Sequence, residues 1–271
     1  MSANPKTFLS EISIYPVKSL SGIQLDEAKV ETIGLQQDRT MMLIDENNVF
    51  ITQRKYPELA LLEVKLKHNT ILIKSPKQQP IQISASDFQV TPLPVTIWKD
   101  NCYGCVASES INSWFSEYLG FTVKLVTYYH TNPRPTDVKY SKPGDIVSYA
   151  DGYPVLVISS GSLADLNSRL QQPVSMKHFR PNIVIDNCEP YAEDDWQQIR
   201  IGEVIFDAVK PCSRCILTTV NPQTGIKDPQ QEPLKTLTQY RKFDSGIIFG
   251  KNLIPHSSGK IKLGDQLTII R

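Results

Sequence analysis

Apolar and polar residues alternate along much of the first half of the chain. Residues 9–15 and 25–33 show this alternation on either side of the loop 16–22. A period of two places successive side chains on opposite faces, so each run predicts a β-strand with one buried face. The polar cluster 45–48 predicts a hairpin turn with positive φ. Further short strands are expected at residues 40–44, 49–53, 61–67, 70–74, 81–83 and 95–98. The rest of residues 78–94, a stretch with three prolines, is expected to be mostly loop.

Helical periodicity is confined to three short segments. In residues 108–119 the apolar side chains recur at helical spacing, Ser108 suits the N-cap and Gly120 follows the end. Residues 162–170 predict a second helix with Ser162 and Asp165 as a capping box, and residues 234–243 predict a third. The remaining apolar runs predict strands at residues 123–128, 154–159, 179–185, 199–209 and 260–270. The chain is therefore expected to be mainly β with short helices, an α+β class.

Strand-dense segments on either side of residue 121 predict two regions. Residues 1–121 are expected to form a β-rich N-terminal domain and residues 122–271 a β-barrel. A stretch with three prolines and mixed charge, residues 130–143, predicts an exposed loop near the mouth of a site.

Composition narrows the function classes. The 271 residues include 29 basic and 28 acidic side chains, a formal net charge of +1, which gives no general field for nucleic acid or for an anionic membrane. No apolar run reaches the length of a membrane span, and residues 1–8 lack the core of a signal peptide. Two CxxC pairs among five cysteines, without an export signal, predict a reducing compartment, the cytoplasm.

The second CxxC pair lies in the sequence KPCSRCILTTVNPQTG, residues 210–225. Pro211 fixes its own φ, so Cys212 and Cys215 are expected on a bend just before a strand formed by ILTTV. Thiolates are ligands that soft metals favour, and Arg214 is expected to lower a thiol pKa and attract an anion. Three alternatives stay open from these residues alone: half of a zinc site with Cys102 and Cys105, a thioredoxin-like redox pair, or two half-buried structural cysteines.

Several basic residues lie in or beside predicted turns: Lys18, Arg39, Arg54 and Arg180. Taken singly, each is most simply a solvated surface charge. Lys18 and Ser19, however, combine a point charge with a hydroxyl in a loop, which suits a phosphate, and arginines offer planar bidentate donors. Arg180 precedes Pro181 at the start of an apolar strand, where an unpaired charge is costly.

Four motifs together resemble a known family. They are YPVKS (15–19), FRPNIVI (179–185), YAEDDW (191–196) and CSRCILTTV followed by NPQTG. The sequence resembles the MOSC superfamily from about Ile12 to Leu267, and within it the mitochondrial amidoxime-reducing components and the bacterial YcbX-like proteins. The resemblance implies a MOSC β-barrel preceded by a β-rich MOSC-associated domain.

The resemblance also implies a molybdenum–molybdopterin cofactor and the residues that hold it. Cys215 is the implied molybdenum ligand and catalytic residue, whereas Cys212 is not a ligand. Lys18, Ser19 and Arg39 are implied to hold the cofactor phosphate. Arg180 is implied to contact the pterin, with Arg54 in a supporting role. The other implied cofactor neighbours are Asp151, Gly152, Ser213, Arg214 and Asn252.

Two departures from the family pattern affect these neighbours. Asp151-Gly152-Tyr153 replaces the family's Asp-Thr-Ser, so a side-chain contact from the middle residue is lost. Asn252 replaces a tyrosine, which is expected to alter substrate preference.

The implied activity is reduction of N-hydroxylated compounds, such as amidoximes and hydroxylamines. No ferredoxin domain follows Arg271, so a separate electron-donor protein, of flavin reductase or ferredoxin type, is expected beside the small-molecule substrate. The alternative is a carrier or sulfur-transfer module that binds the molybdenum pterin without turnover. A third hypothesis, a zinc-stapled binding protein, rests on the two cysteine pairs.

Overall fold

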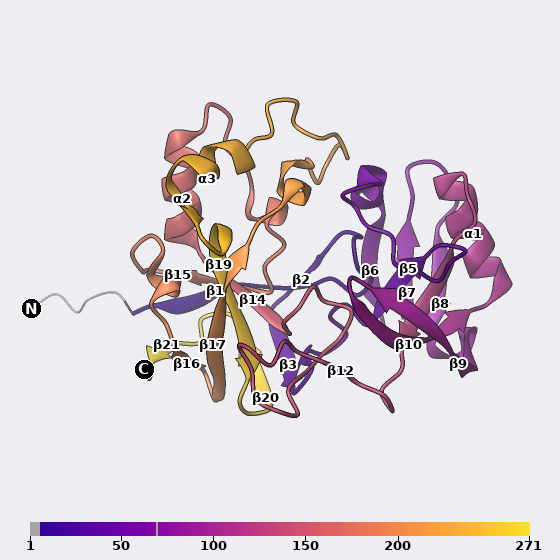
Figure 1. The fold of residues 1–271 in the computed structure, drawn as a ribbon, viewed down its shortest axis with the longest axis horizontal. Helices are drawn as coiled ribbons and strands as arrows, with labels where there is room; N and C mark the ends of the chain where they lie inside the picture. Colours follow the sequence, from indigo (N-terminus) through magenta and orange to yellow (C-terminus); the bar gives the residue numbers. More distant parts are fainter. Residues whose placement is uncertain (1–5, 69) are drawn as a thin grey trace, which may run out of the picture.

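The computed structural model describes residues 6–68 and 70–271. Figure 1 shows two lobes side by side, one built on a long sheet and the other on shorter strands with a helix on its outer side. Strands dominate both lobes and the α-helices are short, so the expected class, mainly β with short helices, is confirmed. Within the described ranges, no helix has the length and apolar character needed to cross a membrane.

The C-lobe, defined here by its nine-stranded sheet, includes the first strands of the chain. Eight strands follow the order β2-β1-β15-β14-β19-β17-β16-β21, and β18 pairs with β19. β1 is antiparallel to β15, with Leu9 opposite Ile185, so the first described strand belongs to the C-lobe. The strands are β1 Phe8–Ile14, β2 Ile23–Leu25, β14 Val155–Ser159, β15 Ile183–Asp186, β16 Gln198–Ile201, β17 Val204–Ser213, β18 Lys242–Phe243, β19 Gly246–Pro255 and β21 Leu267–Ile269.

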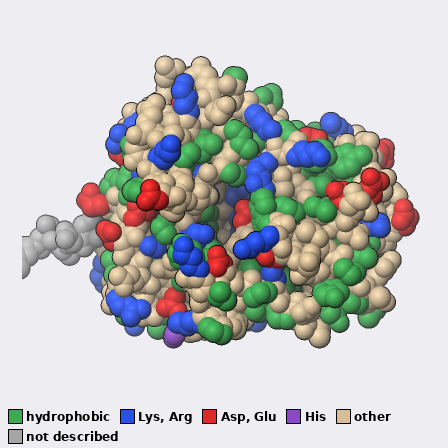
Figure 2. All heavy atoms as spheres, in the orientation of Figure 1, with side chains coloured by type: hydrophobic (Ala, Val, Ile, Leu, Met, Phe, Trp, Pro, Cys, Tyr) green, Lys and Arg blue, Asp and Glu red, His purple; other side chains and the backbone are tan. Residues whose placement is uncertain are grey.

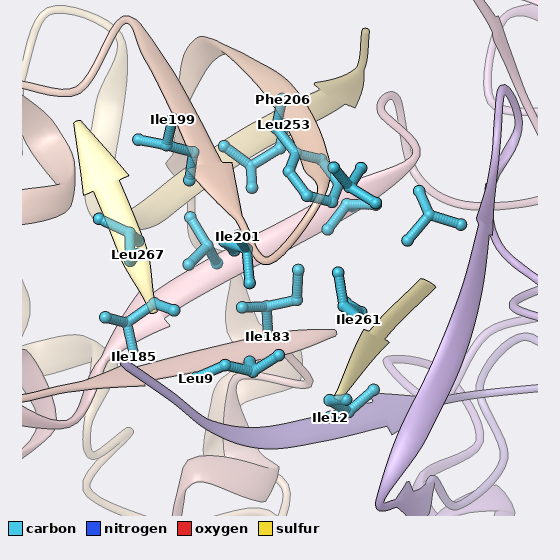
Figure 3. Close-up of a cluster of buried hydrophobic side chains, with 14 of the residues drawn as sticks. Leu9, Ile12, Ile183, Ile185, Ile199, Ile201, Phe206, Leu253, Ile261 and Leu267 are labelled. Carbon is cyan, nitrogen blue, oxygen red and sulfur yellow. The ribbon is translucent and has the colours of Figure 1, made fainter. Parts of the chain in front are cut away.

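Apolar side chains of this sheet form the main core (Figure 3). Leu9 and Ile12 of β1 meet Ile183 of β15, and Phe206 and Leu253 extend the cluster across β17 and β19. Full burial of such a side chain contributes about 1.5–3 kcal/mol. The core therefore fixes β1, and with it the loop after β1 that carries Lys18.

The N-lobe holds two smaller sheets. β5 (Met41–Ile44), β11 (Lys124–Tyr128), β10 (Asp100–Ala107) and β9 (Phe88–Ile97) form one in that order, and β6 (Glu63–Lys67), β7 (Thr70–Lys74) and β8 (Ile81–Ser84) form the other. α1 (Glu109–Leu119) buries Ile111 and Phe115 against this lobe. Two further small sheets are β20-β3-β4 (Gly259–Lys262, Glu27–Glu31, Gly34–Leu35) and β12-β13 (Arg134–Pro135, Ile146–Val147).

The helices follow their predicted positions with corrected ends. α1 has Ser108 at its N-cap position and Gly120 at φ 78° after its end, although the Ser108 side chain makes no capping bond. α2 (Ser160–Arg169) begins earlier than predicted, because Ser159 rather than Ser162 accepts the capping hydrogen bond, from the Ser162 amide. α3 (Leu234–Tyr240) ends before β18. The five 3-10 helices of the described chain are Pro57–Leu61, Ala85–Asp87, Met176–His178, Ala192–Asp194 and Ile216–Thr219.

Several strand predictions need correction. Residues 88–94, predicted as loop, belong to β9, and β10 was not predicted as a strand. β9 lies at the edge of its sheet: it pairs with β10 along one side, and its other side makes an isolated bridge at Thr96, so the missing amide hydrogens of Pro92 and Pro94 do not break the pairing. Residues 25–33 divide between β2 and β3. Residues 49–53 make only isolated bridges, although Asn48 has the expected positive φ, 59°.

No single position in the sequence separates the residues of the two lobes. β11, which follows residue 121, pairs in the N-lobe, whereas β1 pairs in the C-lobe. The domain division between residues 121 and 122 stays a prediction.

Candidate functional site

The CSRC motif lies where β17 ends against β19. Cys212 is within β17 and half-buried, and Cys215 follows the strand and is exposed. The predicted strand for ILTTV is wrong, because Ile216–Thr219 forms a 3-10 helix. The Thr218 hydroxyl donates to the Cys215 carbonyl oxygen at 2.9 Å, a local bond that competes with strand pairing. The turn therefore presents the Cys215 thiol at the end of the sheet.

Arg214, between the two cysteines, is held by backbone carbonyls. Its Nε donates to the Phe249 oxygen at 2.8 Å and its Nη1 to the Phe179 oxygen at 3.2 Å. Its Nη2 is buried and has no hydrogen-bond partner among the described residues. Burial raises the pKa of the Cys212 thiol, and the Arg214 charge opposes this only in part. Arg214 thus acts on the Cys212 pKa in the expected direction, but burial outweighs it and the net shift is upward.

The loop after β1 places Lys18 and Ser19 in a buried position. The Lys18 amide donates to the Met41 oxygen at 2.7 Å, and the Lys18 ammonium donates to the Tyr149 oxygen at 2.9 Å and to the Asp151 carboxylate. Burial lowers the pKa of Lys18, while Asp151 opposes the shift. Desolvation works against ionisation of Asp151, but the charges of Lys18, Arg39 and Arg54 hold its pKa below the ordinary value. At neutral pH Asp151 is therefore an ionised hydrogen-bond acceptor.

Arg39 and Arg180 enclose the ring of Tyr15. Their guanidinium carbons lie 4.4 Å and 4.1 Å from the ring centroid, distances typical of cation–π contact. Arg39 donates to Asn182 Oδ1 at 3.0 Å and to the Arg180 oxygen at 3.0 Å, and it pairs with Asp38. Arg180 donates to the Leu20 oxygen at 2.7 Å, and burial lowers its pKa to about 10. The stack thus ties β1, the turn before β5 and the start of β15 together.

Three of these residues have left-handed backbone: Ser19 at φ 73°, Arg39 at φ 49° and Arg180 at φ 53°. This conformation is unfavourable for residues other than glycine, and such residues cluster at functional sites, where the surrounding structure imposes them. All three face one cavity, which makes that cavity the candidate site.

The cavity, with a volume of about 310 Å³, lies between the lobes. It brings together every site residue predicted from the sequence: Lys18, Ser19, Arg39, Asp151, Gly152, Arg180, Ser213, Arg214, Cys215 and Asn252. Arg54 lines it as well, stacked on the Trp98 ring at 4.0 Å. Six basic residues line the cavity and Asp151 is the one acidic residue among them. Figure 2 shows Lys and Arg side chains around the hollow between the lobes, a local field that the net charge of +1 conceals.

The structure also adds residues that the sequence did not indicate. Lys210 lines the cavity beside Asn252, whose side chain donates to the Lys210 oxygen at 3.1 Å. Tyr153 lines it too, with its buried hydroxyl unpartnered among the described residues. Arg134, within the predicted exposed loop, is buried and contacts the backbone of Asp151. A lysine before a CxxC or an arginine in a proline-rich loop carries no signal of this role.

The first CxxC pair lies elsewhere. Cys102 and Cys105 are buried in β10, and neither lines the cavity. In residues 6–68 and 70–271, no three His, Cys, Asp or Glu side chains are grouped as metal ligands would be. The side chains therefore do not form the zinc site that joins the two pairs.

The residues present fit a molybdenum–pterin cofactor. The cationic groups around Lys18 and Arg39 suit a phosphate, and the exposed Cys215 thiol suits a soft metal. The unpartnered Arg214 Nη2 and Tyr153 hydroxyl are buried donors at the same cavity. A Cβ added to Gly152 meets no heavy atom within 4 Å, so the cavity has open space at this backbone position.

Comparisons with known proteins identify the family to which the chain is similar. Residues 6–122 match the model of the MOSC N-terminal beta barrel domain, and residues 144–268 match the MOSC domain. The chain is 32% identical to human mitochondrial amidoxime-reducing component 1, covering 97% of the chain and 82% of that relative. It is 33% identical to rat mitochondrial amidoxime reducing component 2, with 96% and 82% covered. Among solved structures, the YUAD protein of Bacillus subtilis aligns with a TM-score of 0.44 at 10% identity, over 97% of the chain and 96% of that protein.

Proposed function

Because the chain belongs to the MOSC family, with amidoxime-reducing components among its relatives, we propose that it is a molybdenum-dependent reductase of N-hydroxylated compounds. The single observation that carries the proposal is the cavity in which an exposed cysteine, Cys215, faces a cluster of buried and half-buried cations. Relatives at about 30% identity are named for the reduction of amidoximes. The family and the site support the same activity.

The residues divide the task of binding the cofactor. Lys18, Ser19 and Arg39 hold the phosphate, because they gather an ammonium, a hydroxyl and a guanidinium at one end of the cavity. Arg180, before β15, and Arg214, after β17, present guanidinium groups at the same cavity and would contact the pterin. Cys215 supplies the thiolate ligand. When bound, the molybdenum pterin supplies oxygen-atom removal and two-electron redox chemistry, which no side chain of this cavity provides alone.

The remaining polar residues orient groups rather than transfer protons. Asp151 is ionised at neutral pH, so it accepts hydrogen bonds and does not act as a general acid. Asn182 Oδ1 accepts from Arg39 Nη1 and from the Leu156 amide, and its Nδ2 donates to the Ser13 oxygen, so its side chain holds Arg39 in place. Gly152 leaves open space at the cavity, and Asn252 places a short amide there. These two residues are the proposed source of a substrate preference that differs from the relatives.

The test uses protein produced in cells able to make the cofactor. Molybdenum and pterin are measured per mole, and turnover of an aromatic amidoxime is followed with a reconstituted flavin reductase or ferredoxin-type donor. Near-stoichiometric molybdenum and pterin with turnover supports the proposal. Cofactor without turnover identifies a carrier or sulfur-transfer module, and zinc without pterin overturns both. The separate electron donor and a cytoplasmic location stay predictions.

A further inference from the structure

Arg134 lies at the centre of a network that the proposed cofactor contacts do not include. It is 4% exposed, although it lies in a proline-rich connection between the lobes. Its Nε pairs with Asp100 at 2.8 Å, at the start of β10. Its two terminal nitrogens donate to the Ser148, Ala150 and Asp151 oxygens at 3.2, 2.6 and 3.0 Å. One guanidinium thus holds three carbonyls of a four-residue stretch, here called the 148–151 segment.

The 148–151 segment in turn holds the phosphate-binding residues. The Tyr149 oxygen accepts a hydrogen bond from the Lys18 ammonium, and Asp151 accepts another. The Tyr149 amide donates to the Arg39 oxygen at 2.9 Å, and the Ser148 hydroxyl donates to the Asp38 oxygen at 3.1 Å. The segment therefore fixes the backbone beside Arg39 and the direction of the Lys18 side chain.

We propose that Arg134 is a positioning residue for the anion site, which aims Lys18 into the cavity by holding the 148–151 segment against β10 through Asp100. This inference rests on the proposed function, because the anion is taken to be the cofactor phosphate. Arginine is required because only a planar guanidinium reaches three diverging carbonyls and a carboxylate at once. Arg134 does not line the cavity, so its effect on the anion passes through the segment.

The experiment is a double-mutant cycle on cofactor retention. Wild type, Lys18→Met, Arg134→Lys and the double variant are purified from cofactor-producing cells, and the half-life of pterin loss on dialysis is measured with circular dichroism as the folding check. Loss of one charge-assisted phosphate contact shortens the half-life by about tenfold in Lys18→Met. We expect Arg134→Lys to shorten it by about fivefold alone and by less than about twofold when Lys18 is already absent.

The outcomes separate this inference from the proposed function. An equal fold effect of Arg134→Lys in both backgrounds, or no effect, overturns the positioning role and leaves the phosphate assignment of Lys18 intact. If Lys18→Met itself retains the pterin as wild type does, the phosphate assignment of the proposed function fails, and the positioning role fails with it.

Two further variants complete the experiment, one as an alternative test of the network and one as a control. Because the Asp100 side chain is 32% exposed, we expect Asp100→Asn to fold, and this variant decides the question if Arg134→Lys does not fold. We expect it to shorten the half-life by about twofold, again only when Lys18 is present. Arg169→Lys is the matched control, because Arg169 pairs with Asp165 on the exposed side of α2. It should retain pterin as wild type does.

Discussion

The two CxxC pairs share one spacing and have opposite surroundings. Cys102 and Cys105 lie inside β10 and are buried, with the Cys102 side chain in a cluster of apolar residues. Cys212 and Cys215 straddle the end of β17, where Cys215 is exposed at a cationic cavity. Burial raises the pKa of Cys102 to about 11. The position of a pair relative to a strand end, rather than its spacing, decides whether a thiol is available to a ligand.

The largest expected difference concerns the metal. Cys215→Ser should abolish turnover and reduce bound molybdenum, because a hydroxyl is a harder and far less acidic ligand than a thiol. Cys212→Ser should keep both largely intact, and so should Cys102→Ala in the first pair. Molybdenum content and amidoxime turnover per mole are the measurements. Equal losses in Cys215→Ser and Cys212→Ser would point to a paired role in zinc binding or a disulfide.

The next difference is in thiol reactivity. The thiolate is the reactive form, and a pKa raised from 9.0 to about 11 lowers the thiolate fraction of Cys102 at pH 8 by about a hundredfold. Iodoacetamide labelling with peptide mapping should modify Cys215 of the cofactor-free protein long before Cys102. In denaturant the two rates should converge. Native labelling of Cys102 as fast as Cys215 would contradict the comparison.

A third test addresses the cations that surround Cys215. Arg39→Ala and Arg180→Ala should each weaken pterin retention about tenfold or more, because charge-assisted contacts to a phosphate or pterin are lost. Both variants should remain folded by circular dichroism and melt at lower temperature through lost ligand linkage. Arg200→Ala, at an exposed position of β16, is the control. Full pterin occupancy in both cavity variants would mean that neither arginine holds the cofactor.

The smallest expected effect is on stability. Cys102→Ala should cost about 1 kcal/mol through lost packing, whereas Cys215→Ala, at an exposed site, should be near neutral without cofactor. The pKa of Cys102 is higher in the folded than in the unfolded state. The contribution of this thiol to the free energy of unfolding is therefore complete below pH 9 and is lost as the pH rises towards 11. Urea unfolding at pH 7 and pH 10 should show a smaller decline for Cys102→Ala than for wild type. If wild type and Cys102→Ala lose the same stability between pH 7 and pH 10, Cys102 is not the source of the pH dependence.

The fold class and two of the helices follow from local pattern. α1 shows apolar side chains at helical spacing and ends at Gly120, and both signals are local in sequence. β9 escapes prediction because its edge position, which tolerates Pro92 and Pro94, is a property of the sheet. The β-branched composition of ILTTV predicts a strand. The hydroxyls of Thr218 and Thr219 instead donate to the backbone oxygens three positions earlier, and these bonds favour a 3-10 turn.

Only those site residues that lie in recognisable sequence motifs could be predicted. Lys18, Arg39 and Arg180 came from a resemblance, and the structure places all three at one cavity, although their cofactor contacts stay predictions. Arg134 could not be found in this way, because its three carbonyl partners lie 14 to 17 residues along the chain and carry no side-chain signature. Backbone carbonyls are the same for every residue type, so a sequence gives no hint of which ones an arginine reaches.

The pairing of β1 with β15 has a consequence for the newly made chain. Ser10 of β1 bonds to Val184 of β15, 174 residues later. At ribosomal rates of roughly 5–20 residues per second, about 9–35 s of synthesis separate the two strands. Throughout that interval β2 is the only neighbour in the sheet with which β1 can pair, and the contacts that fix Lys18 to Tyr149 and Asp151 are incomplete. A phosphate-bearing cofactor held by Lys18, as proposed above, would therefore bind only after β15 has been synthesised and has paired with β1.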